Sequence, residues 1–234
     1  MELMGKFFIT GGIKTITGLH IGGQRETLDI GGLDNPVIRD GRKRIYIPGS
    51  SLKGKIRSLL ERKYGTKDEE GKAKNDGKPC ACGTCTICKI FGPHSDKVKE
   101  PARVIVRDCD LLNETKTEIK SENIIDRVSG KALHPRSTER VTSGSVFKFE
   151  IIFNIYKEED KELIKRFIEG MKLLEDDYLG GSGSRGYGKV KFEKMSLFYK
   201  PKEYYEGDED KKMEKRDIPD IADLETKLNE FEFS

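Results

Sequence analysis

The feature that most constrains the fold of this 234-residue chain is a change of hydrophobic period between residues 146 and 175. Over Val146–Tyr156 large apolar residues occupy every second position, which is the period of a strand with one buried face. Over Glu159–Glu175 apolar residues recur at helical spacing and form one stripe. A strand that leads into an amphipathic helix, followed by a further strand over Gly188–Phe198, predicts an α+β fold.

Three more elements precede these and complete the order βαββαβ. A strand is expected over residues 6–16, where two adjacent glycines indicate a bulge or bend. A helix that Ser50 or Ser51 can cap should run to about residue 65, and a strand should cover residues 103–111. This order predicts a ferredoxin-like core, which RNA-recognition modules also use.

Three long insertions interrupt this core, at residues 17–49, 66–102 and 112–145. Loops of this length inside a compact domain are usually functional or disordered. The third insertion reads as an extended arm that carries several arginines. We therefore predict a single domain over residues 1–200, with a separate acidic tail at residues 201–234.

Charge is distributed unevenly along the chain. Residues 202–234 carry 6 basic and 12 acidic side chains, which leaves 38 basic and 29 acidic side chains in the rest. A basic body with an acidic tail suits a nucleic-acid partner, or only a solvated surface. We expect the tail to be loosely packed, with a short helix near residues 223–231.

Two absences from the sequence point to a cytoplasmic protein without a membrane partner. No apolar run approaches the ~20 residues that span a bilayer. The N-terminal residues also lack the apolar region of a signal peptide.

Four of the five cysteines, Cys80, Cys82, Cys85 and Cys88, lie within nine residues. Such crowding in an intracellular protein indicates a metal rather than disulfides. Thiolates at short spacings can surround a tetrahedral Zn²⁺, and His94 is near enough in the sequence to replace one of them. The ligands are therefore the four cysteines, or three of them with His94, and an iron–sulfur cluster is the alternative. Because four protein ligands leave no position for a substrate, we expect a structural zinc site.

The segment GGSGSRGYG at residues 180–188 is rich in glycine and serine. Few side chains obstruct its backbone N–H groups, so a phosphate can approach them closely. The segment connects a helix to a strand, the reverse of an ATP-binding P-loop, and it lacks the Gly-Lys-Ser/Thr ending, which disfavours a nucleotide triphosphatase. The pattern predicts contact with phosphate groups, with a flexible connection as the alternative.

The start of the first expected helix carries three cations, Lys53, Lys55 and Arg57. Free backbone N–H groups at a helix start also attract anions, so we expect these groups and the cations to face one phosphate-binding region. The alternative is a solvated basic face of the helix.

Longer motifs cover nearly the whole chain up to about residue 200. They are ITGLHIGG (16–23), DNPVIRD (34–40), IPGSSLKGKIRSLLE (47–61), CxxCxxCKIFG (82–92), ENIIDRVSGKA (122–132) and LGGSGSRGYGKVKF (179–192). Together they resemble the RAMP superfamily of CRISPR effectors, and within it the backbone subunits of type III-A, or Csm, complexes. The glycine-rich loop and the PGSSLKGK helix start occur in many RAMP proteins. The DNPVIRD segment and the cysteine cluster are more specific to those backbone subunits.

The resemblance implies that several copies stack along a guide RNA (crRNA) as a helical filament, together with the other subunits of the complex. A thumb-like arm of each copy would kink the duplex of guide and target RNA, and each copy would cut the target RNA at regular intervals. The catalytic aspartate of the family corresponds to Asp34 in GGLDNPVIRD. This carboxylate would act as general base toward the 2′-hydroxyl of the RNA, or would hold Mg²⁺ or another divalent ion. Judged without the resemblance, Asp-Asn-Pro is equally a turn sequence.

The residues expected to contact RNA come from the arm, the helix start, the glycine-rich loop and the GLHIGG motif, whose histidine can contact phosphate or stack. They are His20, Ser50, Ser51, Lys53, Lys55, Arg57, Arg127, Arg136, Arg140, Gly181, Ser182, Gly183, Ser184 and Arg185. Phosphate contacts of this kind carry no sequence information.

Other functions remain open at the level of sequence. One is a non-catalytic RNA-binding subunit of a type III complex, which would form the filament or cap it. A RAMP endonuclease that processes precursor guide RNA would need a histidine near the glycine-rich loop, and none of the three histidines lies there in the sequence. The backbone subunit of the type III-B, or Cmr, complex is a neighbouring alternative that the cysteine cluster disfavours.

Overall fold

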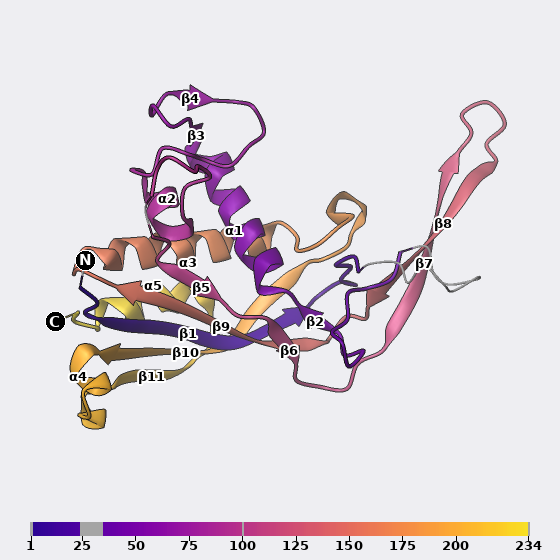
Figure 1. Ribbon diagram of the computed structural model, residues 1–234. Coiled ribbons are helices and arrows are strands. Elements are labelled where there is room, and N and C mark those ends of the chain that lie inside the picture. The colour runs from indigo at the N-terminus through magenta and orange to yellow at the C-terminus, as the bar shows by residue number, and fades with distance from the viewer. Residues whose placement is uncertain (1, 24–34, 100, 234) are drawn as a thin grey trace.

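Figure 1 shows the computed structural model, which describes residues 2–23, 35–99 and 101–233. An antiparallel sheet of seven strands runs through the molecule in the order β11-β10-β1-β9-β6-β2, with β5 also paired to β9. Its strands are β1 (Gly5–Thr15), β2 (Tyr46–Ile47), β5 (Val104–Val106), β6 (Cys109–Leu111), β9 (Val146–Ile155), β10 (Val190–Pro201) and β11 (Met213–Ile218).

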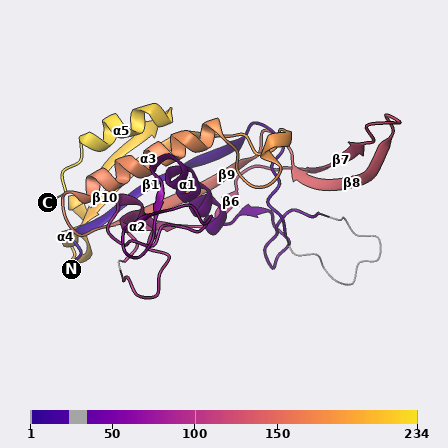
Figure 2. The ribbon, with the colours of Figure 1, turned by 90° about the horizontal axis from the view of Figure 1, so that it is seen from above.

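Helices cover one face of this sheet, as Figure 2 shows from above. They are α1 (Gly49–Tyr64), α2 (Thr86–Phe91), α3 (Asp160–Asp176) and α5 (Ile221–Asn229), and the shorter helical turns are η1 (Gly183–Arg185), α4 (Lys202–Tyr205) and η2 (Glu209–Lys211). The apolar stripe of α3 faces the alternating buried side chains of β9, so that the ring of Phe167 meets that of Phe153 edge-on at 5.3 Å. Each such fully buried side chain stabilises the fold by roughly 1.5–3 kcal/mol. Among the residues described, no helix is both long enough and apolar enough to cross a bilayer.

The mixed α/β architecture predicted from the two hydrophobic periods is confirmed. The strand expected over residues 6–16 is β1, and its register with β10 shifts between Thr10 and Gly12, where a bulge was expected. The strand and helix expected between residues 146 and 175 are β9 and α3. In these elements the repeat of buried side chains can be recognised from consecutive residues of the sequence.

The strand expected over residues 103–111 is instead two short strands, β5 and β6, both paired to β9. They are separated at Arg107 and Asp108. The carboxylate of Asp108 turns away to accept a hydrogen bond from the backbone N–H of Gly49, with 2.7 Å between Oδ1 and N.

That same contact changes the start of α1, which we expected Ser50 or Ser51 to cap. The helix begins at Gly49, the residue before it is Pro48, and no side chain of the N-cap residue accepts a hydrogen bond. Asp108 satisfies the first backbone N–H group in place of a serine hydroxyl. The helix ends at Tyr64, close to the predicted position.

The expectation of a loosely packed C-terminal tail is wrong. Strand β11 extends the sheet beside β10, and α5 corresponds to the short helix predicted near residues 223–231. Beyond α5 the side chains of Phe231 and Phe233 are buried, and both rings contact Phe7 of β1, at 5.2 Å and 5.6 Å between centroids. Five apolar residues that we read as isolated in an acidic segment thus close one end of the core: Ile221, Leu224, Leu228, Phe231 and Phe233.

The second and third predicted insertions form distinct structures outside the sheet. The second contains the small pair β3 (Thr66–Lys67) and β4 (Ala73–Lys74) together with α2, which packs against α1. The third is a two-stranded hairpin, β7 (Thr117–Ile125) and β8 (Ala132–Val141), that projects from the body of the molecule (Figure 1). Within the first insertion, residues 24–34 lie outside the described part of the chain.

Candidate functional site

The glycine-rich loop packs directly on the segment that follows β1. The N–H of Gly181 donates to the carbonyl oxygen of His20 at 2.8 Å, and the N–H of Gly188 donates to that of Gly18 at 2.9 Å. Gly180 has a φ of +78°, and a Cβ atom at this position would lie 2.3 Å from the carbonyl oxygen of His20. Only glycine permits both the conformation and the close approach. The glycines therefore seat the loop on the backbone around His20.

Part of the loop remains open to an anion. The backbone N–H groups of Ser182, Gly183 and Ser184 donate to no residue that the structure describes. Ser182 has a left-handed backbone, with φ 63° and ψ 24°, and the right-handed turn η1 follows it. Such an alternation directs successive N–H groups toward one point, which is the geometry of an anion-binding nest. RNA binding by these residues and by Gly181 stays a prediction that this geometry supports.

His20 has a fixed orientation. Its Nδ1 atom lies 2.7 Å from the carbonyl oxygen of Glu139 in β8. Because a carbonyl oxygen only accepts, Nδ1 is the donor in this contact. The ring lies beside the glycine-rich loop, with its Cδ2 atom 3.6 Å from the position of a Cβ on Gly181.

The root of the β7–β8 hairpin, meaning the part nearest the body of the molecule, contacts the same loop through Lys120 and Glu122 of β7. Nε of Arg185 pairs with Oε2 of Glu122 at 2.7 Å, and the Lys120 ammonium donates to the carbonyl oxygen of Arg185 at 3.0 Å. The cations of Lys120 and Arg140 lie 4.5 Å and 5.1 Å from the centre of the buried Tyr187 ring. The predicted RNA-binding residues Arg140 and Arg185 therefore lie together, in a network of charges and rings that joins loop and hairpin.

Glu139 forms the most buried ion pair of this region, and sequence reasoning missed it. Its side chain is 5% exposed and accepts from both terminal nitrogens of Arg39, at 2.6 Å and 3.0 Å, and from the backbone N–H of Val37 at 2.8 Å. The hydrogen bonds from Arg39 lower the pKa of Glu139 from its ordinary value of 4.5 to about 2. The two side chains are separated by 100 residues, so no local pattern could have paired them.

These contacts hold the segment that starts at Asn35 against β8. The carbonyl oxygen of Asn35 accepts from the N–H of Glu139 at 3.0 Å, and Asn35 forms a parallel bridge with Thr138. Asp34, the predicted catalytic residue, lies outside the described residues. The described chain resumes at the next residue, within this cluster of His20, the glycine-rich loop and the hairpin root.

The three cations of α1 do not face one region: Lys53 and Arg57, one turn apart, share a side of the helix, and Lys55 lies on another. Nζ of Lys55 pairs with Asp177 at 3.2 Å and lies 3.6 Å from the centre of the Tyr178 ring, which brings it to the glycine-rich loop. Lys53 instead donates to the carbonyl oxygen of Val104 at 3.1 Å. Burial lowers the pKa of Lys53. The third cation, at position 57, points to the cysteine segment.

The remaining predicted RNA-binding residues are dispersed. Ser50 is exposed and Ser51 half-buried in the first turn of α1. Arg127 lies exposed in the turn of the hairpin and Arg136 lies exposed in β8, opposite Glu122, and neither forms a salt bridge with a described residue. RNA contacts at all four positions remain predictions.

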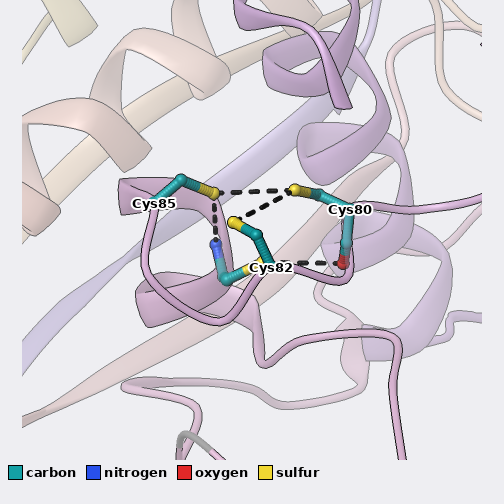
Figure 3. A group of neighbouring side chains, drawn as sticks. Cys80, Cys82 and Cys85 are labelled. Carbon is teal, nitrogen blue, oxygen red and sulfur yellow. Dashed lines mark hydrogen bonds between the residues drawn. The ribbon is translucent and has the colours of Figure 1, made fainter. Parts of the chain in front are cut away.

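The four clustered cysteines converge as the sequence indicated, and Figure 3 labels three of them, Cys80, Cys82 and Cys85. Their sulfur atoms all lie within 4.8 Å of one another, and Sγ of Cys80 is 3.7 Å from Sγ of both Cys82 and Cys85. Zn–S bonds of about 2.3 Å in a tetrahedron place the sulfurs about 3.8 Å apart, so the donors fit this metal. His94 is exposed and reaches the cluster only through its backbone N–H, which donates to the carbonyl oxygen of Cys80 at 3.0 Å.

The protonation pattern of the thiols also suits a metal site. The hydrogen bond with the Cys88 thiol lowers the pKa of Cys85 to about 4, and the same hydrogen bond, together with burial, raises the pKa of Cys88. Thiolates bind the metal, so the close approach of these sulfurs already favours one deprotonated ligand. The four cysteines can thus hold a metal ion.

A clamp that the sequence did not reveal joins this segment to α1. Nε of Arg57 pairs with Oε1 of Glu61 at 2.8 Å, and its NH2 donates to the carbonyl oxygen of Cys80 at 3.0 Å. The same Oε1 of Glu61 accepts from the N–H of Cys80 at 2.9 Å. Arg57 therefore secures the metal-binding segment in this structure, although we had predicted it to face RNA.

Comparisons with known proteins agree with this geometry. Residues 12–191 match the RAMP superfamily. The chain is 59% identical to the CRISPR system Cms endoribonuclease Csm3 of Methanocaldococcus jannaschii, over 98% of this chain and 95% of that protein. It is 41% identical to the Csm3 endoribonuclease of Methanothermobacter thermautotrophicus, over 97% and 99%.

Among solved structures, the chain superposes on one from the crystal structure of the Csm3–Csm4 subcomplex of the type III-A CRISPR-Cas interference complex. The TM-score is 0.72 at 51% identity, over 99% of this chain and 98% of that chain. The sequence and the fold agree over essentially the whole length. The chain therefore belongs to the RAMP superfamily and, within it, to the family of the Csm3 endoribonucleases.

Proposed function

We propose that this protein is the guide-RNA-binding backbone subunit of a type III-A CRISPR complex and that it cleaves the target RNA paired to the guide. Its relatives are named endoribonucleases, and a structural neighbour belongs to a type III-A complex. One structural observation carries the proposal. The glycine-rich loop, His20 and the hairpin root come from distant parts of the chain and meet beside Asn35, the residue that follows Asp34.

RNA would be held through its phosphates. The open N–H groups of residues 182–184 and the nearby cations of Lys55, Arg140 and Arg185 supply the contacts, whose strength depends on salt and not on base sequence. Sequence would be read by base pairing with the guide, as in other RNA-guided effectors.

The architecture suits this role. Strands β10, β1 and β9, with β5 and β6 beside β9 and two helices on one face, support a ferredoxin-like core. The β7–β8 hairpin would be the thumb. It exposes apolar side chains that can lie against bases, among them Ile124, Ile125 and Val128, whose exposure reaches 99% at Val128.

Cleavage would be an intramolecular transesterification. The 2′-oxygen of the target RNA attacks the adjacent phosphorus, the bond from phosphorus to the 5′-oxygen breaks, and a 2′,3′-cyclic phosphate results. Asp34 would accept the proton of the 2′-hydroxyl as general base, and the departing 5′-oxygen takes up a proton from solvent. Mg²⁺ or another divalent ion held near Asp34 would supply charge stabilisation at the phosphoryl oxygens. Since one carboxylate is a modest catalyst, in-line positioning of a kinked substrate would provide much of the rate.

The metal of the cysteine cluster would be a structural Zn²⁺. Cys80, Cys82, Cys85 and Cys88 provide all four ligands, so no coordination position is left for the RNA. The cluster would stabilise an insertion that buries few apolar side chains of its own. The other partners we propose are further copies of this chain in a filament along the crRNA, and the other subunits of the complex.

The test is cleavage by the complex reconstituted from the full chain, guide RNA and partner subunits, with a matched target RNA and Mg²⁺. Asp34→Ala should bind the target as tightly as wild type but yield no regularly spaced fragments. Asp96→Ala, which removes another exposed carboxylate, is the control and should cut normally. If wild type binds without cutting, the protein is the non-catalytic RNA-binding subunit. If Asp34→Ala still cuts, the catalyst lies elsewhere.

A further inference from the structure

A basic turn precedes β2, and apart from Arg39, the partner of Glu139, none of its residues has been assigned a role above. Residues 39–44 read RDGRKR, so four of the six side chains are cationic and one is acidic. The turn ends the segment that begins at Asn35, and Asp34 immediately precedes that segment in the sequence. Figure 1 shows this segment beside the root of the hairpin, to which Arg39 is joined through Glu139.

The turn is built as a rigid element. Oδ1 of Asp40 accepts from the backbone N–H groups of Arg42 and Arg44, at 2.9 Å and 2.8 Å, and its own N–H donates to the carbonyl oxygen of Arg44 at 2.9 Å. Lys43, at the tip, has a φ of +63°, a left-handed conformation that a lysine adopts only where the surroundings impose it. The side chains of the tip are therefore presented in a fixed direction.

Two of the four charges are not neutralised. Arg39 pairs with Glu139 at 2.6 Å, and Arg44 pairs with Asp40 at 2.8 Å. Arg42 and Lys43 are exposed and form no salt bridge with any residue that the structure describes. The rigid turn therefore presents, side by side, two cations whose charge no described carboxylate offsets.

A cleft of about 470 Å³ opens beside the turn. The cleft is lined by Arg39, Lys43 and Arg44 of the turn, by Asp110 and Leu111 of β6, and by Thr115 and Thr117 just before and at the start of β7. Arg44 is paired with Asp40 and also interacts with the charge of Asp110, so Lys43 is the lining cation that no described carboxylate pairs with. Cations and hydroxyl donors around a cleft of this size suit a phosphate with its ribose.

We propose that the turn of residues 39–44 and its cleft bind the phosphate backbone of an RNA strand. This proposal deepens the proposed function and rests on it. The contact would be independent of sequence.

The experiment measures the salt dependence of RNA binding for the double variant Arg42→Gln/Lys43→Gln. In one arm the isolated full chain binds labelled guide RNA. In the other, the complex assembled with guide and partner subunits binds a labelled, complementary target RNA. Because each phosphate contact contributes about 0.7 to 0.9 to the slope of log Kd against log salt, the slope should become shallower by about 1.4 to 1.8 for each copy of the chain on the RNA. The arm in which this occurs identifies the strand.

Two further variants make the result specific. Arg62→Gln/Lys78→Gln removes the same number of charges from two exposed positions, one in the last turn of α1 and one in the loop before the cysteine cluster, and should leave both slopes unchanged. Arg42→Lys/Lys43→Arg keeps the charges and should restore the wild-type slope.

Three results would overturn the proposal. The first is a slope for Arg42→Gln/Lys43→Gln that equals the wild-type slope in both arms. The second is an equal change of slope in the Arg62→Gln/Lys78→Gln control. The third is normal RNA binding by Arg42→Gln/Lys43→Gln with fewer copies of the chain per complex, measured by mass photometry. The last would assign the turn to an acidic protein surface. If wild type binds RNA in neither arm, the proposed function itself fails, and that outcome is recognised before any variant is compared.

Discussion

Replacing Glu139 with glutamine tests how the segment beside Asp34 is held in place. The pKa of Glu139 falls from 4.5 to about 2, and each unit corresponds to about 1.36 kcal/mol of preference for the ionised form in the folded state. The full shift is therefore about 3 kcal/mol. Glutamine keeps an acceptor for the N–H of Val37, and the Arg39 side chain is 32% exposed and can be partly rehydrated. We expect Glu139→Gln to lower the free energy of unfolding by about 2 kcal/mol at neutral pH.

The lowered pKa of Glu139 also predicts how the loss of stability in the variant changes with pH. Because the folded-state pKa is the lower one, the stabilisation by Glu139 is fully present above about pH 4.5 and disappears as the pH falls toward 2. The difference between variant and wild type should therefore shrink over this range.

Urea unfolding at a series of pH values measures both effects, with Arg39→Gln and the double variant completing a thermodynamic cycle. Hydrogen exchange should show faster exchange at Val37 and Glu139, whose N–H groups lie in this contact. A loss below about 0.5 kcal/mol at pH 7, or a loss that persists unchanged at low pH, would refute the reasoning.

Three further substitutions test other parts of the structure. Cys85→Ser should lose the bound metal in elemental analysis and lower the melting temperature, whereas the control Cys109→Ala should keep the metal. If the Cys85→Ser variant retains the metal, Cys85 is not a ligand. Phe231→Ala should lower the free energy of unfolding by about 3–5 kcal/mol in denaturant because its ring is fully buried, whereas Tyr205→Ala, at an exposed position, should lower it by about 0.5 kcal/mol or less. Equal losses in the two variants would contradict the packing of the tail. Glu122→Gln should lower the free energy of unfolding by less than about 1 kcal/mol, since its partner Arg185 is half exposed, but it should speed hydrogen exchange at the root of the hairpin. Unchanged exchange there would show that this ion pair does not hold the hairpin against the loop.

The parts of the fold that could be predicted are those whose burial repeats along consecutive residues. In β9 and α3 the period of apolar side chains is local information, and both elements lie where it placed them. The four cysteines converge because their spacing is short, so local chain geometry suffices to bring the sulfur atoms together.

The rest depends on contacts between residues far apart in the chain. Nothing near Asp108 indicates that its carboxylate would accept from Gly49, which both interrupts a strand and starts α1 without a serine cap. Likewise Arg57 reads as an exposed helix cation, and only the folded insertion supplies its partners. The aromatic residues that anchor the tail are spaced too widely within acidic sequence to give a recognisable period.

The position of β1 determines when this protein can fold during its synthesis. Both neighbours of β1 in the sheet come from the second half of the chain: Gly5 pairs with Ile155 of β9 and with Pro201 of β10. The first strand to leave the ribosome therefore gains its first partner only when residues 146–155 have been made and its second only with residues 190–201, and such non-local pairing makes folding slow. A chain that stops before residue 190 leaves one edge of β1 unpaired, together with the apolar surface that the last residues would cover. Unpaired strand edges and exposed apolar surface of this kind favour aggregation and degradation of incomplete chains.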